Sequence, residues 1–117
     1  MEEVMVASER AREFCIKKNM DKRTAHMTAL FIEETVGNAM AHKSGKEVIA
    51  EVRVILKDEA RIIRIRDNGK QFDPVEWYEK NHPEDPSSGL GIRIVMSLAK
   101  EVRFVPALGL NNLMIRM

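Results

Sequence analysis

The stretch RIIRIRDNGKQFDP, residues 61–74, alternates isoleucine with arginine and then stops on a carboxylate. In a β-strand, residues two apart share a face, so Ile63, Ile65 and Asp67 point the same way. If the isoleucines face the core, Asp67 points toward the end of that core. An unpaired buried carboxylate is costly. Asp67 therefore either accepts hydrogen bonds from the backbone of its own turn or awaits a donor from outside.

Helices and antiparallel strands are predicted on both sides of this stretch. Apolar residues recur every three or four positions in residues 3–19 and 22–43, which predicts two helices, with Asp21 as the N-cap of the second. Period-two patterns predict strands over 46–57, 61–67, 102–105 and 113–117. A third helix is predicted from Gly89 to about Lys100. This order predicts an α+β two-layer sandwich: a mixed, mostly antiparallel sheet with about three helices on one face.

Residues 68–88 are predicted to be a long loop. They are polar and include Pro74, Pro83, Pro86 and a pair of serines, with room for one helical turn near residues 75–79. A loop of this length inside a compact domain is uncommon and usually functional. The alternative is a surface insertion that the fold tolerates.

Composition predicts one globular domain, residues 1–117. The chain is 44% hydrophobic and 32% charged, with a net charge of +1. That charge provides no field toward nucleic acid or anionic lipid, and no apolar run is long enough to cross a membrane. The single cysteine, Cys15, cannot form an internal disulfide and is interpreted as a small core residue. We therefore expect a cytoplasmic protein that does not bind nucleic acid directly.

A polar stripe runs along the second predicted helix, where Glu34, Asn38 and His42 are spaced four residues apart. Gly37 lies beside the stripe, and a glycine inside a helix costs about 1 kcal/mol relative to alanine, so it suits a close approach by a ligand or another backbone. The stripe is either a solvent face or a set of oxygen ligands for a hard cation such as Mg²⁺.

The segment Gly89-Leu90-Gly91 follows the polar loop and opens the third predicted helix. Glycines at a helix start let anions approach, and the free N–H groups and helix dipole favour phosphate. The alternative is a simple helix entry. No GxxxxGK[ST] motif occurs, and the glycines do not follow an opening strand as in a dinucleotide-binding fold.

The order of these motifs resembles the GHKL (Bergerat-fold) ATPase superfamily of sensor histidine kinases, gyrase, heat-shock-90 chaperones and MutL-type repair proteins. The resemblance rests on four blocks: EETVGNAMAH (33–42), DNGKQFDP (67–74), SGLGIRIVMSLAKEV (88–102) and GLNNLMIRM (109–117). Sensor kinases usually have a second glycine at position 71 and close with Gly-Thr. This chain has Gln71, then Phe-Asp-Pro and Gly-x-Asn-x-Leu, which look most similar to the anti-sigma-factor serine/threonine kinase branch.

The resemblance implies roles for individual residues. Asn38 would ligate the Mg²⁺ that bridges the ATP phosphates, and Glu34 would be the general base. Asp67 would accept the adenine amino group, and Gly69 would let the base lie close to the backbone. The other residues implied to contact the nucleotide are His42, Phe72, Ser88, Gly89, Leu90 and Gly91.

Several of these assignments have alternatives. Residues 73–88 would form the mobile ATP lid. His42 would lie near the phosphates or cap the end of its helix. Lys70 and Arg93 are interpreted as solvated side chains rather than as phosphate contacts. The related branch normally has a strand before its first helix, so we expect that strand to be missing here and the chain to be part of a larger protein.

The leading hypothesis is a Mg²⁺-dependent ATP-binding domain with serine/threonine kinase activity on a small regulatory partner, either anti-anti-sigma-like or sigma-like. Dimerisation is common in the family, so the resemblance also allows a homodimer. One alternative is an ATP-sensing interaction module whose output is a change in the lid, without turnover. Another is the catalytic domain of a sensor histidine kinase, which is disfavoured because no phosphoacceptor-histidine hairpin precedes it.

Overall fold

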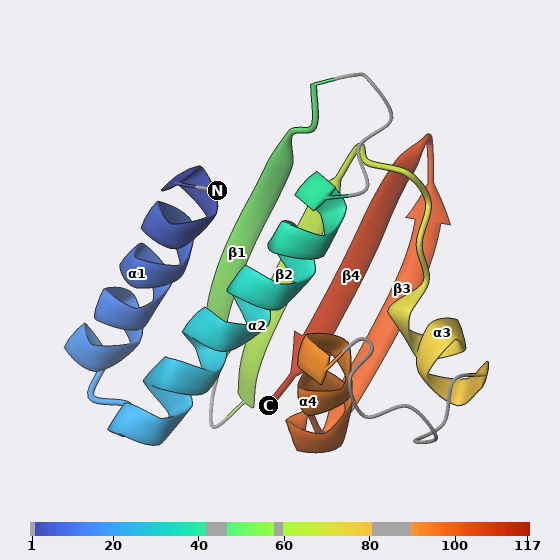
Figure 1. Ribbon diagram of the computed structural model, residues 1–117. Helices are drawn as coiled ribbons and strands as arrows, with labels where there is room; N and C mark the ends of the chain where they lie inside the picture. Colours follow the sequence, from blue (N-terminus) through green and yellow to red (C-terminus); the bar gives the residue numbers. More distant parts are fainter. Residues whose placement is uncertain (1, 42–46, 58–59, 81–89) are drawn as a thin grey trace.

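The computed structural model describes residues 2–41, 47–57, 60–80 and 90–117. Four helices and four strands are assigned within these ranges (Figure 1). In chain order they are α1 (Glu2–Lys17), α2 (Lys22–Ala41), β1 (Ala50–Lys57), β2 (Ala60–Asp67), α3 (Pro74–Lys80), α4 (Leu90–Leu98), β3 (Glu101–Ala107) and β4 (Leu110–Arg116).

The four strands form one sheet in the order β1-β2-β4-β3, and every neighbouring pair is antiparallel. Helices α1, α2 and α4 lie over one face of it, and α3 lies beside α4 near the β3 edge (Figure 1). The expected two-layer α+β fold is confirmed. The details differ in two ways: the described strands contain no parallel pair, and a fourth helix is present.

The core lies between the helices and the sheet, where strand alternation places apolar side chains. Ile63 and Ile65 are 0% and 2% exposed, and Asp67 is 8% exposed at the end of the same row. From α2, Phe31 and Ile32 are fully buried against them. Burying such a side chain stabilises a fold by about 1.5–3 kcal/mol. Cys15 is also fully buried, as expected.

The first strand begins later than predicted. The expected range was 46–57, whereas β1 begins at Ala50. Asn68 explains the difference, because its side chain holds the segment just before β1. The Ile49 N–H donates to Asn68 Oδ1 at 2.7 Å, and Asn68 Nδ2 donates to the Glu47 carbonyl at 3.2 Å. Asn68 thus holds this segment through its side chain and through its backbone N–H, which donates to the Ile49 carbonyl at 3.3 Å.

The helical turn expected near residues 75–79 of the predicted loop is present as a longer helix, α3, from Pro74 to Lys80. Asp73 caps α3, since its Oδ1 accepts hydrogen bonds from the N–H groups of Val75 and Glu76 at 2.9 and 3.2 Å. Pro74 occupies the first helical position, where its missing N–H costs nothing. Lys80 donates to Glu76 one turn away, which lowers the pKa of the Glu76 carboxyl. Only Asp73–Lys80 of the predicted lid 73–88 falls within the described residues.

The last two strands are longer than predicted because the turn between them is tighter. Leu108 and Gly109 both have positive φ, 54° and 74°, which is the geometry of a two-residue type I′ hairpin turn. β3 therefore ends at Ala107 and β4 begins at Leu110, whereas the predicted strands were 102–105 and 113–117. Asp21 caps α2 as expected, accepting from the Thr24 N–H at 2.8 Å. Within the described ranges, no helix has the length and hydrophobicity needed to cross a bilayer.

Candidate functional site: a pocket between α2, α4 and the sheet

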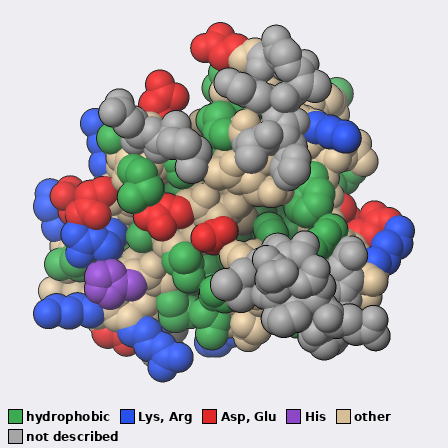
Figure 2. Space-filling model, in the orientation of Figure 1, with side chains coloured by type: hydrophobic (Ala, Val, Ile, Leu, Met, Phe, Trp, Pro, Cys, Tyr) green, Lys and Arg blue, Asp and Glu red, His purple; other side chains and the backbone are tan. Residues whose placement is uncertain are grey.

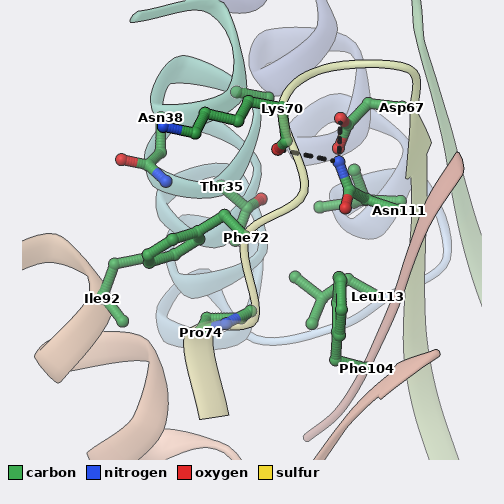
Figure 3. A pocket seen from close by; sticks show the side chains of 12 residues that line it. Thr35, Asn38, Asp67, Lys70, Phe72, Pro74, Ile92, Phe104, Asn111 and Leu113 are labelled. Carbon is green, nitrogen blue, oxygen red and sulfur yellow. Dashed lines mark hydrogen bonds between the residues drawn. The ribbon is translucent and has the colours of Figure 1, made fainter. Parts of the chain in front are cut away.

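A pocket opens between α2, the segment after β2, the start of α4 and the inner face of the sheet (Figure 3). It holds about 460 Å³ of space, counting the part open to solvent. Its polar lining residues are Thr35, Asn38, Asp67, Lys70 and Asn111. Its apolar lining residues are Ala39, Ile65, Phe72, Pro74, Ile92, Phe104 and Leu113. The pocket thus combines an apolar slot with a few polar groups, as is typical of small-molecule sites.

Asp67 lies at the inner end of the slot, where β2 ends. Its Oδ1 accepts hydrogen bonds from the Gly69 N–H and from Asn111 Nδ2, both at 2.8 Å. No hydrogen bond from the described residues reaches Oδ2. The first alternative raised by the sequence therefore holds for Oδ1, which is satisfied by its own turn and by β4, while a donor from outside for Oδ2 stays a prediction.

Gly69 keeps the turn close to α2. A Cβ added there would lie 3.0 Å from Asp67 Oδ1 and 3.4 Å from the Ala39 carbonyl oxygen, which is tighter than ordinary contact. A side chain at this position would push the turn away from α2 or disturb the hydrogen bonds of Asp67. The glycine therefore suits the close approach of this turn to Asp67 and α2.

Glu34 and Asn38 lie on adjacent turns of α2, and both are half-buried. Gly91, the second residue of α4, packs directly against Glu34, because a Cβ added to Gly91 would overlap the Glu34 carboxylate. Neither Glu34 nor Asn38 makes a side-chain hydrogen bond to another described residue. The packing of α2 on α4 thus places Glu34 of the predicted polar stripe beside the predicted helix start at Gly91.

The whole chain, residues 1–117, matches the family model of the histidine kinase-like ATPase domain. The chain belongs to this family. No curated protein matches the sequence at a significant level. Membership in the family makes this chain an ATP-binding domain, and the pocket described above joins an apolar slot to both Asn38 and Asp67.

Asn111 is a part of the ATPase pocket that sequence reasoning did not assign. Besides Asp67, its Nδ2 lies 3.2 Å from the carbonyl oxygens of Gly69 and of Lys70, so one side chain ties the turn after β2 to β4. Asn111 belongs to the Gly-x-Asn-x-Leu block that carried the resemblance. Its pairing with Asp67 follows only from the register of β2 on β4.

Asn111→Ala is expected to lower the free energy of unfolding by about 1–3 kcal/mol, because it leaves buried acceptors of the turn without their donor. Urea denaturation measures the change. Asn112→Ala is the matched control. Asn112 lies on the other face of β4 and accepts from Arg66 Nε at 3.0 Å in an exposed hydrogen bond, so its loss is expected to cost about 0.5 kcal/mol or less. Equal losses in the two variants would contradict the role given to Asn111.

Two cations near the pocket differ in position. Lys70 is exposed as expected, but it borders the pocket, and its side chain extends toward Asn38 (Figure 3). Arg93 is half-buried rather than solvated, with its guanidinium 5.8 Å from the centre of the Trp77 ring. This contact holds α4 against α3. Arg93 is therefore a packing residue between α3 and α4.

Three of the predicted nucleotide contacts, His42, Ser88 and Gly89, lie outside the described residues. Leu90 is described as the first residue of α4. Of the remaining predicted residues, Asn38, Asp67 and Phe72 line the pocket, and Gly69, Glu34 and Gly91 contact that lining or each other. In the described ranges, no group of three or more His, Cys, Asp or Glu side chains could hold a metal ion.

Proposed function

We propose that this domain binds ATP with Mg²⁺ in the pocket and transfers the γ-phosphoryl group to a serine or threonine of a small regulatory protein. The observation that carries the proposal is the chemical difference between the two ends of the pocket. One end has Asp67, whose Oδ2 has no donor among the described residues, and the other has Asn38, which lies one turn of α2 from Glu34, the residue packed against the first turn of α4.

The Asp67 end suits adenine. A purine that enters the slot would contact apolar walls such as Ile65 and Ile92, both buried. The 6-amino group of adenine is a hydrogen-bond donor, and Asp67 Oδ2 is an acceptor without a donor among the described residues. A hydrogen bond to a charged group contributes about 1.5–3 kcal/mol. Guanine presents an acceptor at the same place and would be rejected.

The α4 end suits phosphate and Mg²⁺. Gly91 brings backbone rather than a side chain to the helix start, where N–H groups and the helix dipole favour anions. Mg²⁺ is usually held by one or two protein oxygens together with waters and phosphates, so the amide oxygen of Asn38 fits such a site. When bound, the ion would neutralise charge on the phosphates. Lys70, which extends toward Asn38, adds a positive charge at the mouth.

Glu34 is proposed as the general base. Its carboxylate would orient the incoming hydroxyl and accept its proton. The hydroxyl oxygen forms a bond to the γ-phosphorus while the bond between that phosphorus and the bridging oxygen of ADP breaks. Catalysis of this kind consists mostly of positioning and charge neutralisation. The packing of Glu34 against Gly91 keeps the base beside the place proposed for the phosphates.

The direct test is incubation of the domain with γ-labelled ATP, Mg²⁺ and candidate anti-anti-sigma-type proteins. The expected result is label on a serine or threonine of one of them, and none when EDTA removes Mg²⁺. ATP binding without transfer to any candidate would contradict the kinase proposal and leave a nucleotide-binding module.

Gly91→Ala is expected to abolish most transfer while preserving the fold. Alanine is a better helix former than glycine by about 1 kcal/mol, but its Cβ would displace the flexible Glu34 carboxylate. We expect thermal stability to change little and the rate of transfer to fall about 100-fold, the scale of a lost general base. Ser97→Ala, at an exposed position of the same helix, is the control and should keep full activity. A fully active Gly91→Ala protein would show that the position of Glu34 is irrelevant.

A further inference from the structure

The face of the sheet that carries no helix presents a regular grid of charged residues. Cross-strand pairing places them in three rows, each running from β1 through β2 and β4 to β3. The rows are Glu51–Arg66–Asn112–Val105, Arg53–Arg64–Met114–Arg103 and Ile55–Ile62–Arg116–Glu101. We call these twelve positions the open face. It is solvent-accessible over the described residues, with most of its arginines exposed and Met114 half-buried at its centre.

The open face is strongly basic. It holds five arginines against two glutamates, although the net charge of the whole chain is only +1. On the helix-bearing side, Lys and Arg side chains lie mainly around the periphery, and acidic side chains lie over α2 (Figure 2). The open face therefore has an excess of three positive charges, which can attract a partner of opposite charge.

The middle row is unfavourable for the isolated domain. Arg53 and Arg64 are directly opposite each other, and like charges in that arrangement destabilise a sheet. Arg64 forms no hydrogen bond or ion pair with another described residue. Arg53 and Arg103 pair with Glu51 and Glu101 of their own strands at 2.9 and 2.8 Å, but these pairs are exposed and contribute little. All three guanidinium groups can therefore exchange their present surroundings for carboxylates of a partner at small cost.

The spacing of the row indicates the size of that partner. Neighbouring strands lie about 4.8 Å apart, so Arg53 and Arg103, separated by three such steps, are about 14 Å apart. No single phosphate or carboxylate bridges that distance. A matching surface must carry several carboxylates, with an apolar group between them to cover Met114. Arginine is well suited to such contacts, because its planar group pairs with a carboxylate through two hydrogen bonds.

The charge pattern also distinguishes between kinds of partner. A second copy placed face to face would bring arginines against arginines. Binding of single-stranded nucleic acid normally uses aromatic side chains on which bases stack, and the twelve open-face residues include none. We therefore propose that the open face docks an acidic protein segment with carboxylates spaced around a small apolar patch. This proposal does not depend on nucleotide binding, because the pocket lies on the opposite, helix-bearing side of the sheet.

Fluorescence anisotropy with a labelled acidic peptide tests the proposal. The probe is a helical peptide of about 20 residues, roughly 30 Å long, with glutamate and aspartate around two leucines. A second peptide, with lysines in place of the acidic residues, is the charge-reversed control. The variant is Arg53→Glu with Arg64→Glu, which replaces one like-charge pair by another and also removes the exposed Arg53–Glu51 pair, a loss of about 1 kcal/mol or less. The matched control is Arg10→Glu with Arg23→Glu, two exposed positions on α1 and α2 with the same change in net charge.

We expect the unmodified protein to bind the acidic peptide, the open-face variant to bind it at least 10-fold more weakly, and the helix control to change by less than about 2-fold. Thermal unfolding establishes that both variants are folded. The proposal is overturned if the lysine peptide binds as well, if both variants lose affinity equally, or if a single-stranded oligonucleotide binds more tightly. It is also overturned if sedimentation shows that the face joins two copies of the chain.

Discussion

Asp67→Asn is expected to weaken ATP binding by about 2–3 kcal/mol, or roughly 30- to 150-fold, while the protein stays folded. The substitution keeps the shape of the side chain. The amide oxygen of asparagine can still accept from the Gly69 N–H and from Asn111, as Oδ1 does now. The NH₂ group then takes the place of Oδ2. In the proposed pose this NH₂ group would face the adenine amino group. Both groups are donors, so the hydrogen bond that the carboxylate accepts would be lost.

Isothermal titration calorimetry with ATP and GTP measures this effect. The proposed adenine contact predicts a preference for ATP in the unmodified protein and a loss of that preference in the variant. Asp21→Asn is the matched control, because Asp21 is an exposed N-cap at the far end of α2, and asparagine is an equally good cap. Unchanged ATP affinity in Asp67→Asn would show that adenine does not bind beside Asp67.

Glu34→Gln is expected to lower the rate of phosphoryl transfer by about 10²- to 10⁴-fold, the usual contribution of a general base. ATP affinity should stay the same or rise slightly, because a negative charge near the proposed phosphates is removed. Single-turnover transfer of labelled phosphate separates the two quantities.

Glu33→Gln serves as the neighbouring control. Glu33 Oε1 accepts from the Ser8 hydroxyl of α1 at 2.9 Å, a structural role that glutamine can keep. A Glu34→Gln protein with normal transfer would show that Glu34 is not the base. A domain whose partner response survives Glu34→Gln unchanged would instead be an ATP sensor.

Short-range patterns in the sequence predicted what depends on local geometry. The shared face of Ile63, Ile65 and Asp67 follows from the period of a strand, and the structure buries all three. The adjacency of Glu34 and Asn38 follows from the helical repeat. The Asp21 cap and the α+β order were predicted for the same reason, since each depends on residues close together in the chain.

Long-range contacts were not predicted from these patterns. Asn111 meets Asp67 across 44 residues of sequence, and this meeting is set by the register of β4 on β2. The packing of Gly91 on Glu34 depends on how α4 lies against α2. Helix α3 was predicted only as a single turn near residues 75–79, because proline and acidic residues suggested a loop, although Asp73-Pro74 is also a good helix start.

Nucleotide binding by the unmodified protein can be measured by a thermal-shift comparison of ATP, ADP and GTP, each with and without Mg²⁺. A ligand at 100 times its dissociation constant stabilises the folded state by about 2.7 kcal/mol, which corresponds to a rise in Tm of roughly 10 °C for a domain of this size. The account predicts such a rise with ATP and ADP, a larger one when Mg²⁺ accompanies ATP, and almost none with GTP. Equal shifts for ATP and GTP, or no shift with either, would contradict it.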